Sequence, residues 1–573
     1  MKETDLPFYR LVFFAAIVVA TGAFLLGRAA TLQLFLGNRY SVQAEENRLV
    51  IRRFHPPRGI ITDRNGVVLV RNAPAFRLVE EGKEPRLVSN EEALAYELRP
   101  ETLEGVVEID ARREYPESEI FAHAFGYVSE VNKEELERPE FSSYVPGDRV
   151  GRLGLEAMYE PSLRGVVGRA LVEADAIGQR LRVISTDQAV SGKTLVTTLD
   201  ASLQRRTYEL LKRMAEERAA PGAAAVLMDA RDGSIRAMVS FPSFDPKILI
   251  RGEDEAAISS LLSDPNFPMV NRTIGASYPP ASTFKIVTSL AGLTSGKVNA
   301  DTLVEDTGEI RLGPYVFSNW YFTQYGKKEG FLTLVRAMSR SNDIFFYRVA
   351  QWVEHELIST IAEKFGFGEK SGIDLPGEVR GLVPNTAWKR KVKGEPWLPG
   401  NTLHLGIGQG DMLATPLQIA AMTAGIATEG KIPTPHLGER LIDPATSKEQ
   451  VLEFPTRGVE GIDASFYSLI REGMVGACSQ GGTAWPFFSP EAFPVSVACK
   501  TGTAEFGDPA NRTHAWFTAF APAENPEVVV TVVVEASGEG SSVAAPVAKA
   551  MLAQYFGIEL PKDKAKPADA VGD

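Results

Sequence analysis

The chain has 573 residues, which is enough for several domains. Lysine and arginine number 61 and aspartate and glutamate number 73, so the net charge of −12 argues against sequence-independent binding of nucleic acid. Hydrophobic residues make up 44% and charged residues 23%, which excludes a disordered, collagen-like or polytopic membrane chain. The two cysteines, Cys478 and Cys499, are too few for a disulfide scaffold, a zinc-ribbon array or an iron–sulfur protein. We expect two independent buried thiols, with a single Cys478–Cys499 disulfide as the alternative.

An uncharged apolar segment, Leu11–Gly27, lies near the N-terminus, and a second apolar run, Thr31–Leu36, follows it. About 20 apolar residues span a bilayer, whereas the apolar core of a signal peptide has only ~7–15. We therefore expect an uncleaved transmembrane anchor over residues 11–30, preceded by a cytoplasmic tail of residues 1–10. A cleaved signal peptide and a buried core helix are the alternatives. Basic residues flank the segment on both sides, so they do not determine its orientation.

Mixed strand and helix signals follow the anchor and predict an extended, dimerisation-like pedestal domain over residues 31–195. In Arg58–Asn72, apolar runs on both sides of Asn65-Gly66 predict a hairpin with a tight primed turn. The charged segment Glu91–Glu140 is typical of short helices and strands on a surface.

Strand signals occur at both ends of the remaining chain and enclose a helical middle. A helix with Asp200 or Ser202 as its N-cap is predicted over Asp200–Ala215. Strands are predicted at Ala223–Ala230, Ser234–Ser240, Pro494–Ala504, Ala515–Pro522 and Glu527–Ala536. Further helices are predicted at Ser282–Leu293, Leu332–Val353 and Val543–Tyr555. Together these elements predict an α+β domain over residues 196–557, with one central antiparallel sheet flanked by helices, and a disordered tail over residues 558–573.

A serine and a lysine lie on the first turn of one predicted helix. Ser282 and Lys285 follow Tyr278-Pro279-Pro280, in which the two prolines end an extended segment and allow a helix to begin. Residues three apart on a helix lie side by side. A serine hydroxyl is a poor nucleophile without a base, and a neutral lysine beside it can be that base. The alternative is an N-cap serine next to a solvated lysine.

The second motif is Ser341-Asn342-Asp343, which precedes the apolar run that begins at Ile344. Taken alone, a polar triplet before an aromatic stripe indicates a helix cap over a core face. The motif is of interest because it lies between the serine–lysine pair and a third motif.

The third motif is Lys500-Thr501-Gly502-Thr503, at the end of a predicted strand. Because side chains alternate along a strand, we expect Lys500 and Cys499 on opposite faces. A cation, two hydroxyls and a glycine suit an edge strand that pairs with an extended peptide and holds its carboxylate. Taken alone, an ordinary turn is the alternative.

The order and spacing of the three motifs resemble those of penicillin-binding proteins and serine β-lactamases. Ser341 follows Ser282 by 59 residues, and Lys500 follows Ser341 by 159 residues. The chain resembles class B penicillin-binding proteins, most closely the elongation-type penicillin-binding protein 2. The resemblance covers nearly the whole chain and includes Pro57–Leu69, Gly154–Gly165, Phe317–Trp320, Trp388-Lys389 and His404–Ala420.

By this resemblance, Ser282 attacks the carbonyl between the two terminal D-alanines of a peptidoglycan stem peptide, and Lys285 takes its proton. Ser341 relays a proton to the leaving amine, and an amine of a neighbouring stem peptide then resolves the acyl-enzyme. The oxyanion is expected between the backbone N–H groups of Ser282 and Thr503. The substrate carboxylate is expected at the third motif: Lys500, Thr501, Gly502 and Thr503.

Two features depart from many relatives of this family. Asp343 stands where many relatives carry Asn, and near Lys285 its carboxylate favours the charged lysine, which opposes a role as base. Lys500 acts in the other direction, because a second cation favours the neutral form. Some elongation-type relatives bind zinc between the first two motifs through Asp, His and Cys. Residues 301–340 contain no His and no Cys, so we expect no metal site, and no cofactor is implied.

The resemblance implies a membrane-anchored, serine-type D-Ala-D-Ala transpeptidase, inhibited covalently by β-lactams, that acts in elongation and maintenance of rod shape. It implies a single-pass protein of the inner membrane with most of the chain in the periplasm. Its implied partners are stem peptides, a SEDS-type glycan polymerase and rod-complex scaffold proteins, without nucleic acid. The alternatives are a septal class B transpeptidase, a β-lactam-hydrolysing or β-lactam-sensing relative, and a catalytically silent scaffold. Close to the cleft, we expect a structural or pocket-wall role for His514 and close packing at Gly406–Gly410.

Overall fold

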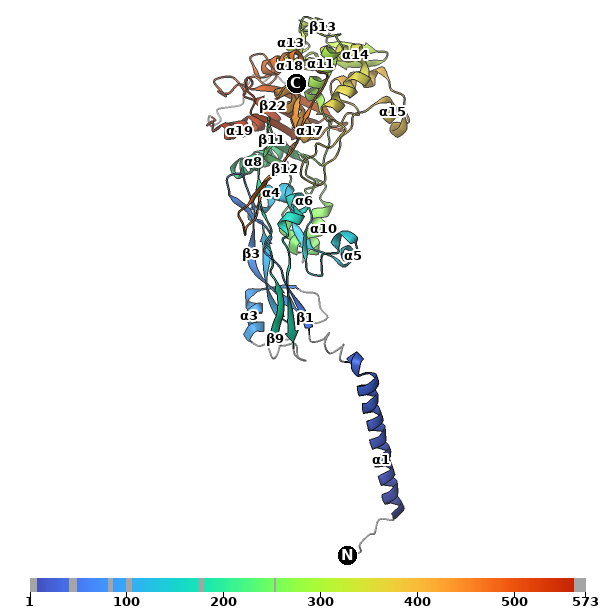
Figure 1. Ribbon diagram of the computed structural model, residues 1–573. Coiled ribbons are helices and arrows are strands. Elements are labelled where there is room, and N and C mark those ends of the chain that lie inside the picture. Colours follow the sequence, from blue (N-terminus) through green and yellow to red (C-terminus); the bar gives the residue numbers. More distant parts are fainter. Residues whose placement is uncertain are drawn as a thin grey trace. The chain divides into compact units, whose positions relative to one another are not determined.

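The computed structural model describes residues 8–40, 49–80, 86–98, 106–174, 180–251 and 254–560. Most of the two predicted tails, residues 1–7 and 561–573, lie outside the described residues. The chain divides into two compact units, residues 1–57 with 165–191 and residues 58–164 with 192–573. Element labels follow Figure 1.

The first unit carries the apolar N-terminal helix. Helix α1 (Phe8–Ala30), dark blue in Figure 1, continues into a π-helical turn, η1 (Thr31–Phe35). These 28 residues form a helix that is long and apolar enough to cross a membrane, and its apolar stretch is not buried against the rest of the protein. The segment predicted as the anchor is therefore helical. The unit also contains an antiparallel sheet of three strands, β1 (Leu49–Phe54), β8 (Gly168–Ala174) and β9 (Arg180–Asp187).

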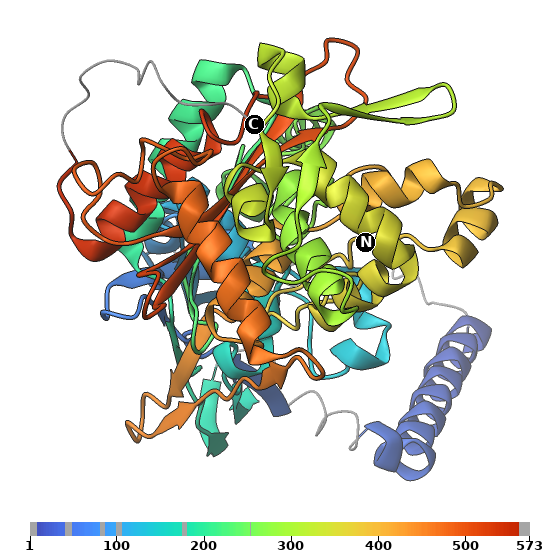
Figure 2. The ribbon, with the colours of Figure 1, turned by 90° about the horizontal axis from the view of Figure 1, so that it is seen from above.

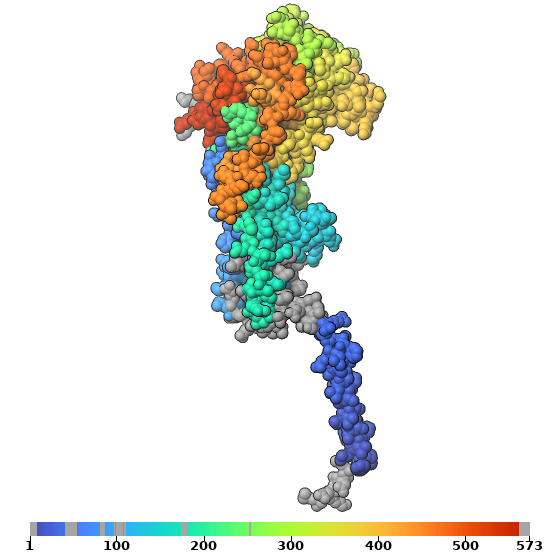
Figure 3. Space-filling model, in the orientation of Figure 1, coloured from blue at the N-terminus to red at the C-terminus, as the bar shows by residue number. Residues whose placement is uncertain are grey.

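The second unit begins with a sheet of seven strands in the order β19-β18-β10-β2-β3-β4, with β5 paired to β3. The strands are β2 (Ile61–Thr62), β3 (Val68–Val79), β4 (Arg86–Val88), β5 (Val106–Glu114), β10 (Thr194–Thr197), β18 (Gly438–Ile442) and β19 (Glu449–Val451). Strands β18 and β19 come from far along the chain, and β18 pairs antiparallel with β10. In Figure 3 an orange segment accordingly lies against the blue and teal part of this unit.

The predicted hairpin around Asn65-Gly66 is present, since β2 pairs antiparallel with β3. The predicted primed turn is wrong, because Gly66 has a positive φ of 85° and Asn65 does not. Asp63 explains the difference: its carbonyl accepts the Gly66 N–H at 3.2 Å, and its carboxylate accepts the N–H groups of Asn65 and Val67, both at 2.8 Å. The aspartate side chain therefore builds a turn that needs only one left-handed residue.

Short helices and strands make up the rest of this part of the chain, and a buried ion cluster joins them. They are α3 (Asn90–Leu98), α4 (Ser118–Phe125), β6 (Val128–Glu130), α5 (Lys133–Leu136), η2 (Pro139–Phe141), β7 (Arg149–Gly151), α6 (Gly154–Met158) and α7 (Glu160–Leu163). The fully buried Glu156 accepts from Arg58 Nη2 at 2.8 Å and from Arg113 Nε at 2.7 Å. Burial raises the pKa of the Glu156 carboxyl, but Arg113 and Arg58 outweigh burial and hold that pKa below its usual value.

A five-stranded antiparallel sheet lies at the centre of the remaining part, in the order β12-β11-β23-β22-β21. The strands are β11 (Ala223–Asp229), β12 (Ile235–Phe241), β21 (Ala498–Glu505), β22 (Thr513–Ala521) and β23 (Val528–Val534). Strand β11, from the start of this region, pairs along its full length with β23, from its end. The predicted α+β fold, with one antiparallel sheet assembled from distant strands, is confirmed.

Helices cover both faces of this sheet, as Figures 1 and 2 show. Alternating side chains enter two cores: on β11, Val226 belongs to one core and Leu227 to the other. One face is covered by α8 (Ala201–Arg218) and α19 (Ala544–Phe556). The other face is covered by α11 (Lys285–Thr294), α14 (Asp343–Lys364) and α17 (Pro416–Ala427). Asp200 caps α8 by accepting from the N–H groups of Ser202 and Leu203, which confirms one of the two predicted caps.

Several short elements complete the region. The helices are α9 (Pro246–Arg251), α10 (Glu255–Ser263), α12 (Trp320–Tyr325), α15 (Thr386–Trp388), η4 (Lys389–Lys393), α16 (Pro399–Gly406) and α18 (Ala464–Cys478). The strands are β13 (Val304–Asp306), β14 (Glu309–Leu312), β15 (Tyr315–Ser318), β16 (Gly330–Leu332), β17 (Lys431–Pro433) and β20 (Thr456–Gly458). Strands β13–β16 and helix α12 lie between the first two sequence motifs, and we call residues 304–332, which contain them, the inter-motif lobe.

The single helix predicted over Leu332–Val353 is wrong, because the chain forms two helices there. They are α13 (Leu334–Ser339) and α14, and the second motif lies at the break. Ser341 takes a left-handed φ of 54°, which an L-residue adopts only at a cost, and this ends the first helix. The Asn342 side chain accepts from the N–H of Phe345 at 3.0 Å and caps the second helix.

The two cysteines form a disulfide, so the expectation of two independent thiols is wrong. Cys478, the last residue of α18, is bonded to Cys499 on β21. Their Cα atoms are 5.9 Å apart, within the usual range for a disulfide, because α18 packs directly on β21. Sequence spacing does not show that contact. Cys499 lies in the core, as predicted.

Candidate active site

Ser282 lies on a short 3₁₀ turn, η3 (Ala281–Phe284), directly before α11, rather than on the first turn of the helix itself. The Thr283 hydroxyl donates to the Pro280 carbonyl at 2.7 Å, which ties the turn to the prolines before it. Ser282 is half-buried, whereas the other three residues of the turn are buried. Its side chain is therefore the one on this turn that has access to solvent.

Lys285, the first residue of α11, is fully buried and joins the first motif to the second. Its Nζ donates to Asp343 Oδ1 at 2.7 Å, to the Ser341 carbonyl at 2.7 Å and to Ser341 Oγ at 3.3 Å. A polar group removed from water is costly unless it is hydrogen-bonded, and these three oxygens satisfy the amine of Lys285.

The Ser341 hydroxyl is the point at which the two lysines meet. Lys500 Nζ donates to Ser341 Oγ at 2.7 Å and to the Thr501 carbonyl at 3.0 Å. The left-handed φ of Ser341 lets its carbonyl and its hydroxyl both face Lys285. Ser341, Lys285 and Lys500 are all fully buried. Groups from all three motifs, far apart in the sequence, thus form one hydrogen-bonded cluster.

The third motif lies on β21, which is an edge strand of the central sheet. Cys499 enters the core shared with α8 and α19, whereas Lys500 bonds to Ser341 on the other face. Gly502 allows β21 to approach the Ser282 turn, because a Cβ there would lie 3.3 Å from Thr283 Cγ2. The strand therefore brings its lysine and its glycine to the same side as the serine.

The two threonines of the third motif differ in their surroundings. Thr501 is fully buried, and its hydroxyl shares a hydrogen bond of 2.8 Å with the hydroxyl of Thr483. Thr503 is half-buried, and its hydroxyl accepts from the N–H of Gly540 at 3.4 Å. Thr503 therefore has the more accessible hydroxyl of the pair.

Comparison with known proteins identifies the family. Residues 223–553 match the penicillin-binding protein transpeptidase domain, and residues 84–197 match the penicillin-binding protein dimerisation domain. The chain belongs to the class B penicillin-binding proteins. The predicted resemblance is thereby confirmed, and so is the predicted enzyme class, a D,D-transpeptidase of the penicillin-binding kind.

The relatives of this class B penicillin-binding protein extend over nearly its whole length. Peptidoglycan D,D-transpeptidase MrdA of Salmonella typhimurium strain SL1344 is 31% identical over 614 residues, which cover 95% of each chain. Stage V sporulation protein D of Bacillus subtilis strain 168 is 27% identical over 91% of this chain and 81% of its own. Penicillin-binding protein PBP2 in its solved complex with MreC from Helicobacter pylori has a TM-score of 0.76 and 27% identity, over 89% of this chain and 99% of its own. A chain of a solved peptidoglycan synthase complex gives a TM-score of 0.75 and 31% identity, over 96% of this chain and 98% of its own.

His514 lies on β22 beside the third motif and is buried. Its Nδ1 accepts from the N–H of Ala536 at 3.1 Å, and its ring stacks on Phe506 with the centroids 4.1 Å apart. Burial lowers the pKa of His514 to about 4, although Glu535 and Asp508 act in the opposite direction. At neutral pH the ring is therefore uncharged and serves packing in this class B penicillin-binding protein.

Two residues beside the motifs were not among the predicted site residues. Thr483, which fixes the Thr501 hydroxyl, lies in the loop after α18 and carries no sequence signal of its own. Gly408 accepts from the N–H of Ala281 at 2.8 Å and has a φ of 71°. A Cβ at Gly408 would lie 2.5 Å from Phe284 Cβ, so this glycine packs against the Ser282 turn. The expected close packing at Gly406–Gly410 is confirmed.

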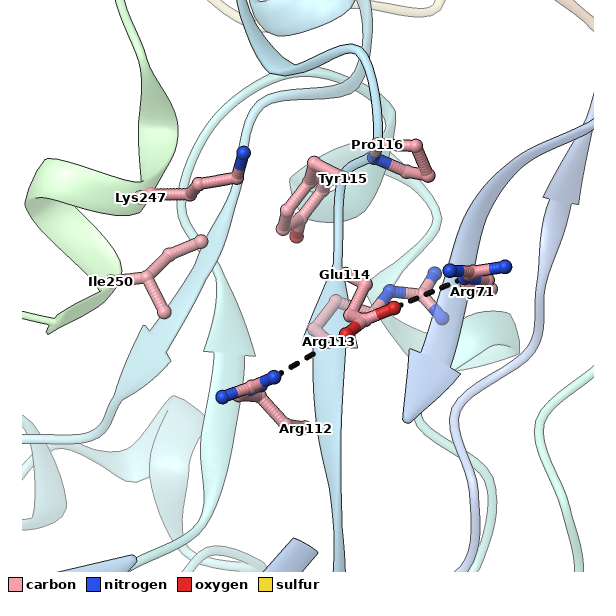
Figure 4. A pocket seen from close by; sticks show the side chains of 8 residues that line it. All are labelled: Arg71, Arg112, Arg113, Glu114, Tyr115, Pro116, Lys247 and Ile250. Atoms are coloured by element: carbon pink, nitrogen blue, oxygen red, sulfur yellow. Dashed lines mark hydrogen bonds and ion pairs between the residues drawn. The ribbon is translucent and has the colours of Figure 1, made fainter. Parts of the chain in front are cut away.

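A separate pocket of about 240 Å³ contains none of the motif residues. Figure 4 shows its lining: Arg71, Arg112, Arg113, Glu114, Tyr115, Pro116, Lys247 and Ile250. Glu114 pairs with Arg71 Nε at 3.0 Å and with Arg112 Nη2 at 3.4 Å, so part of the positive charge is already balanced. Among the residues that the structure describes, no group of His, Cys, Asp and Glu could hold a metal ion.

Proposed function

We propose that this chain is a membrane-anchored peptidoglycan D,D-transpeptidase in which Ser282 is the acylated nucleophile. One observation carries the proposal: the hydroxyl of Ser341 contacts the Nζ atoms of both Lys285 and Lys500, next to the turn that bears Ser282. A chain of such groups suits proton transfer between a nucleophile and a leaving amine. Asp343 accepts from Lys285 Nζ and stabilises the positive charge that this lysine gains when it takes up a proton.

In the first step, Ser282 Oγ attacks the carbonyl carbon between the two terminal D-alanines of a stem peptide. Its proton passes to Lys285 in the neutral form, and the negative carbonyl oxygen is bound by the backbone N–H groups of Ser282 and Thr503. The C–N bond then breaks, and the leaving amine takes the proton from Lys285 through Ser341. The products are an ester on Ser282 and free D-alanine.

In the second step, an amine of a neighbouring stem peptide attacks the ester carbonyl. Its proton returns to the serine oxygen through Lys285, the ester bond breaks, and one new peptide bond replaces the bond that was lost. Before the first step, the terminal carboxylate of the donor peptide binds at the third motif, to Lys500, Thr501 and Thr503, while Gly502 keeps the strand close to the Ser282 turn. The edge position of β21 supports this binding mode, because an extended peptide can add to an edge strand.

We further infer a role in cell elongation and rod shape at the inner membrane. The support is the 31% identity to MrdA and the apolar helix α1, which would leave a pedestal (residues 31–195) and a transpeptidase domain (residues 196–557) in the periplasm. Stage V sporulation protein D is also similar, at a lower identity of 27%, so the role in elongation rests on the higher identity to MrdA. By the same likeness, the partners are a SEDS-type polymerase and a rod-complex protein such as MreC, which the Helicobacter pylori relative binds.

Labelling with a fluorescent penicillin tests the chemistry. The purified full chain should form a lasting adduct on Ser282, located by mass spectrometry of the labelled peptide, and Ser282→Ala should abolish it. Slow loss of the adduct separates a transpeptidase from a β-lactamase, which releases its product quickly. A folded wild-type chain that takes no label at Ser282 would contradict the proposal.

Depletion of the protein in its own cells tests the role in elongation. We expect round cells, and we expect that Ser282→Ala does not restore rod shape. Filamentous cells would instead indicate a septal transpeptidase. Full rescue by Ser282→Ala would show that the protein acts as a catalytically silent scaffold.

A further inference from the structure

The inter-motif lobe forms hydrogen bonds with both the backbone and the side chain of Asp343. One carboxylate oxygen of Asp343, Oδ1, bonds to Lys285. The other oxygen, Oδ2, accepts from the backbone N–H of Trp320 at 3.0 Å. The backbone N–H of Asp343 donates to Asn319 Oδ1 at 3.1 Å. The carboxylate that pairs with the lysine is thus positioned by two consecutive residues of the lobe.

Asn319 connects Asp343 to a second buried carboxylate. Asn319 is fully buried, and its Nδ2 donates to Asp306 Oδ2 at 3.1 Å. Asp306 is 2% exposed and also accepts the N–H groups of Gly308 at 2.8 Å and Glu329 at 3.0 Å. The amide therefore presents its oxygen to a backbone N–H and its nitrogen to a carboxylate. An ionised aspartate at position 319 could accept from the backbone N–H but could not donate to the Asp306 carboxylate, and an alanine could do neither.

The same lobe also binds Arg340 and Asn342, the residues on either side of Ser341. The Glu329 carboxylate accepts from Arg340 Nε at 2.5 Å and from Asn342 Nδ2 at 3.3 Å. The backbone of Glu329 is bound in turn to Asp306. The left-handed Ser341 is thus flanked by two residues that one carboxylate holds in place.

We propose that Asn319 is a positioning residue for the transpeptidase reaction, which holds Asp343, and through it Lys285, in line with Ser341. The proposal rests on the proposed function of Ser282 and Lys285. A buried polar network is rigid when every member is satisfied and costly when one is not. Loss of the Asn319 amide removes the partner of the Asp343 N–H and one donor to Asp306, so Asp343 keeps only its bond to the Trp320 N–H from the lobe and its carboxylate shifts more easily.

The test is the rate at which a penicillin acylates the full chain, with non-covalent binding and the acylation step measured separately. Asn319→Ala should slow the acylation step roughly 10- to 100-fold, because small displacements of a catalytic group have effects of that size, while non-covalent affinity is unchanged. Asn319→Asp should be slower still, since it places two carboxylates face to face in a buried site. Thr307→Ala is the control, because its hydroxyl bonds to the Glu309 carbonyl at 2.8 Å within the same lobe and has no part in the contacts of Asp343; it should acylate at the wild-type rate.

An exchanged pair separates positioning from a general loss of stability. Asn319→Asp combined with Asp306→Asn restores a donor between the two side chains, and it should regain part of the rate lost in Asn319→Asp alone. Thermal unfolding of every variant is measured alongside. Wild-type acylation in folded Asn319→Ala would overturn the proposal, as would an equal loss of rate in Thr307→Ala. If Asn319→Ala does not fold, the exchanged pair decides: recovery supports the proposal, and a folded pair no faster than Asn319→Asp overturns it. Absence of labelling in the wild-type chain would instead refute the function of Ser282.

Discussion

A methyl group added at Gly408 should displace the turn that carries Ser282, the proposed nucleophile. Gly408 is buried with a φ of 71°, and a Cβ there would lie 2.5 Å from Phe284 Cβ and closer still to the Ala281 carbonyl. An L-residue at this φ costs about 1–2 kcal/mol, and overpacking a filled site adds about 1–3 kcal/mol. Gly408→Ala should therefore lower the free energy of unfolding by about 2–5 kcal/mol and slow acylation roughly 10- to 100-fold through displacement of Ser282.

Gly394 offers a matched control, since it has a φ of 72° and a Cβ there would meet nothing within 4 Å. Gly394→Ala carries the backbone cost alone, so we expect a loss of about 1–2 kcal/mol and unchanged acylation. Urea unfolding gives the two stabilities, and the rate of labelling by a fluorescent penicillin gives the two activities. Equal stabilities together with equal labelling rates would refute the reasoning from close packing.

Two further predictions concern stability. Cys478→Ala combined with Cys499→Ala should lower the free energy of unfolding by about 3 kcal/mol, because the disulfide closes a loop with a sequence separation of 21; a urea titration that gives the same midpoint for the variant and the oxidised wild type would contradict this. Glu156→Gln should cost about 3–5 kcal/mol, because it leaves Arg58 and Arg113 without their buried counter-charge. The pKa of Glu156 is lowered in the folded chain, so its contribution is complete above about pH 5 and is lost as the pH falls below ~4. Melting curves of the variant and the wild type should converge in acid, and a constant difference across pH would argue against the ion cluster.

The strands of the central sheet could be predicted because each one is marked by a local pattern in the sequence. Each strand is a short apolar or β-branched run, and burial on both faces leaves runs such as Val528–Val534 almost without polar residues. The assembly of one antiparallel sheet from strands at the two ends of this region was also predicted, because mainly helices were predicted between them, but the pairing of β11 with β23 was not. The three motifs were found by their residue types and order, and the sequence contains that information.

The features that were missed depend on contacts between distant residues. The polar triplet indicated a helix cap, which Asn342 provides, but its residue types did not predict the left-handed φ of Ser341, whose carbonyl and hydroxyl bond to Lys285. The disulfide needs the packing of α18 on β21, which spacing alone does not give. Asn319 lay in a stretch noted for its resemblance, but its bonds to Asp306 and Asp343 appear only in three dimensions.

The antiparallel pairing of β18 with β10 ties the two family domains into one folding unit. Residues 438–442 belong by sequence to the transpeptidase match, yet their hydrogen-bonding partners are residues 194–197, at the end of the dimerisation match. Cutting the chain between the two matches would strip β18 of that neighbour and leave an open strand edge, which invites association with other copies. Preparations that keep the upstream segment should therefore stay monodisperse where isolated catalytic fragments aggregate.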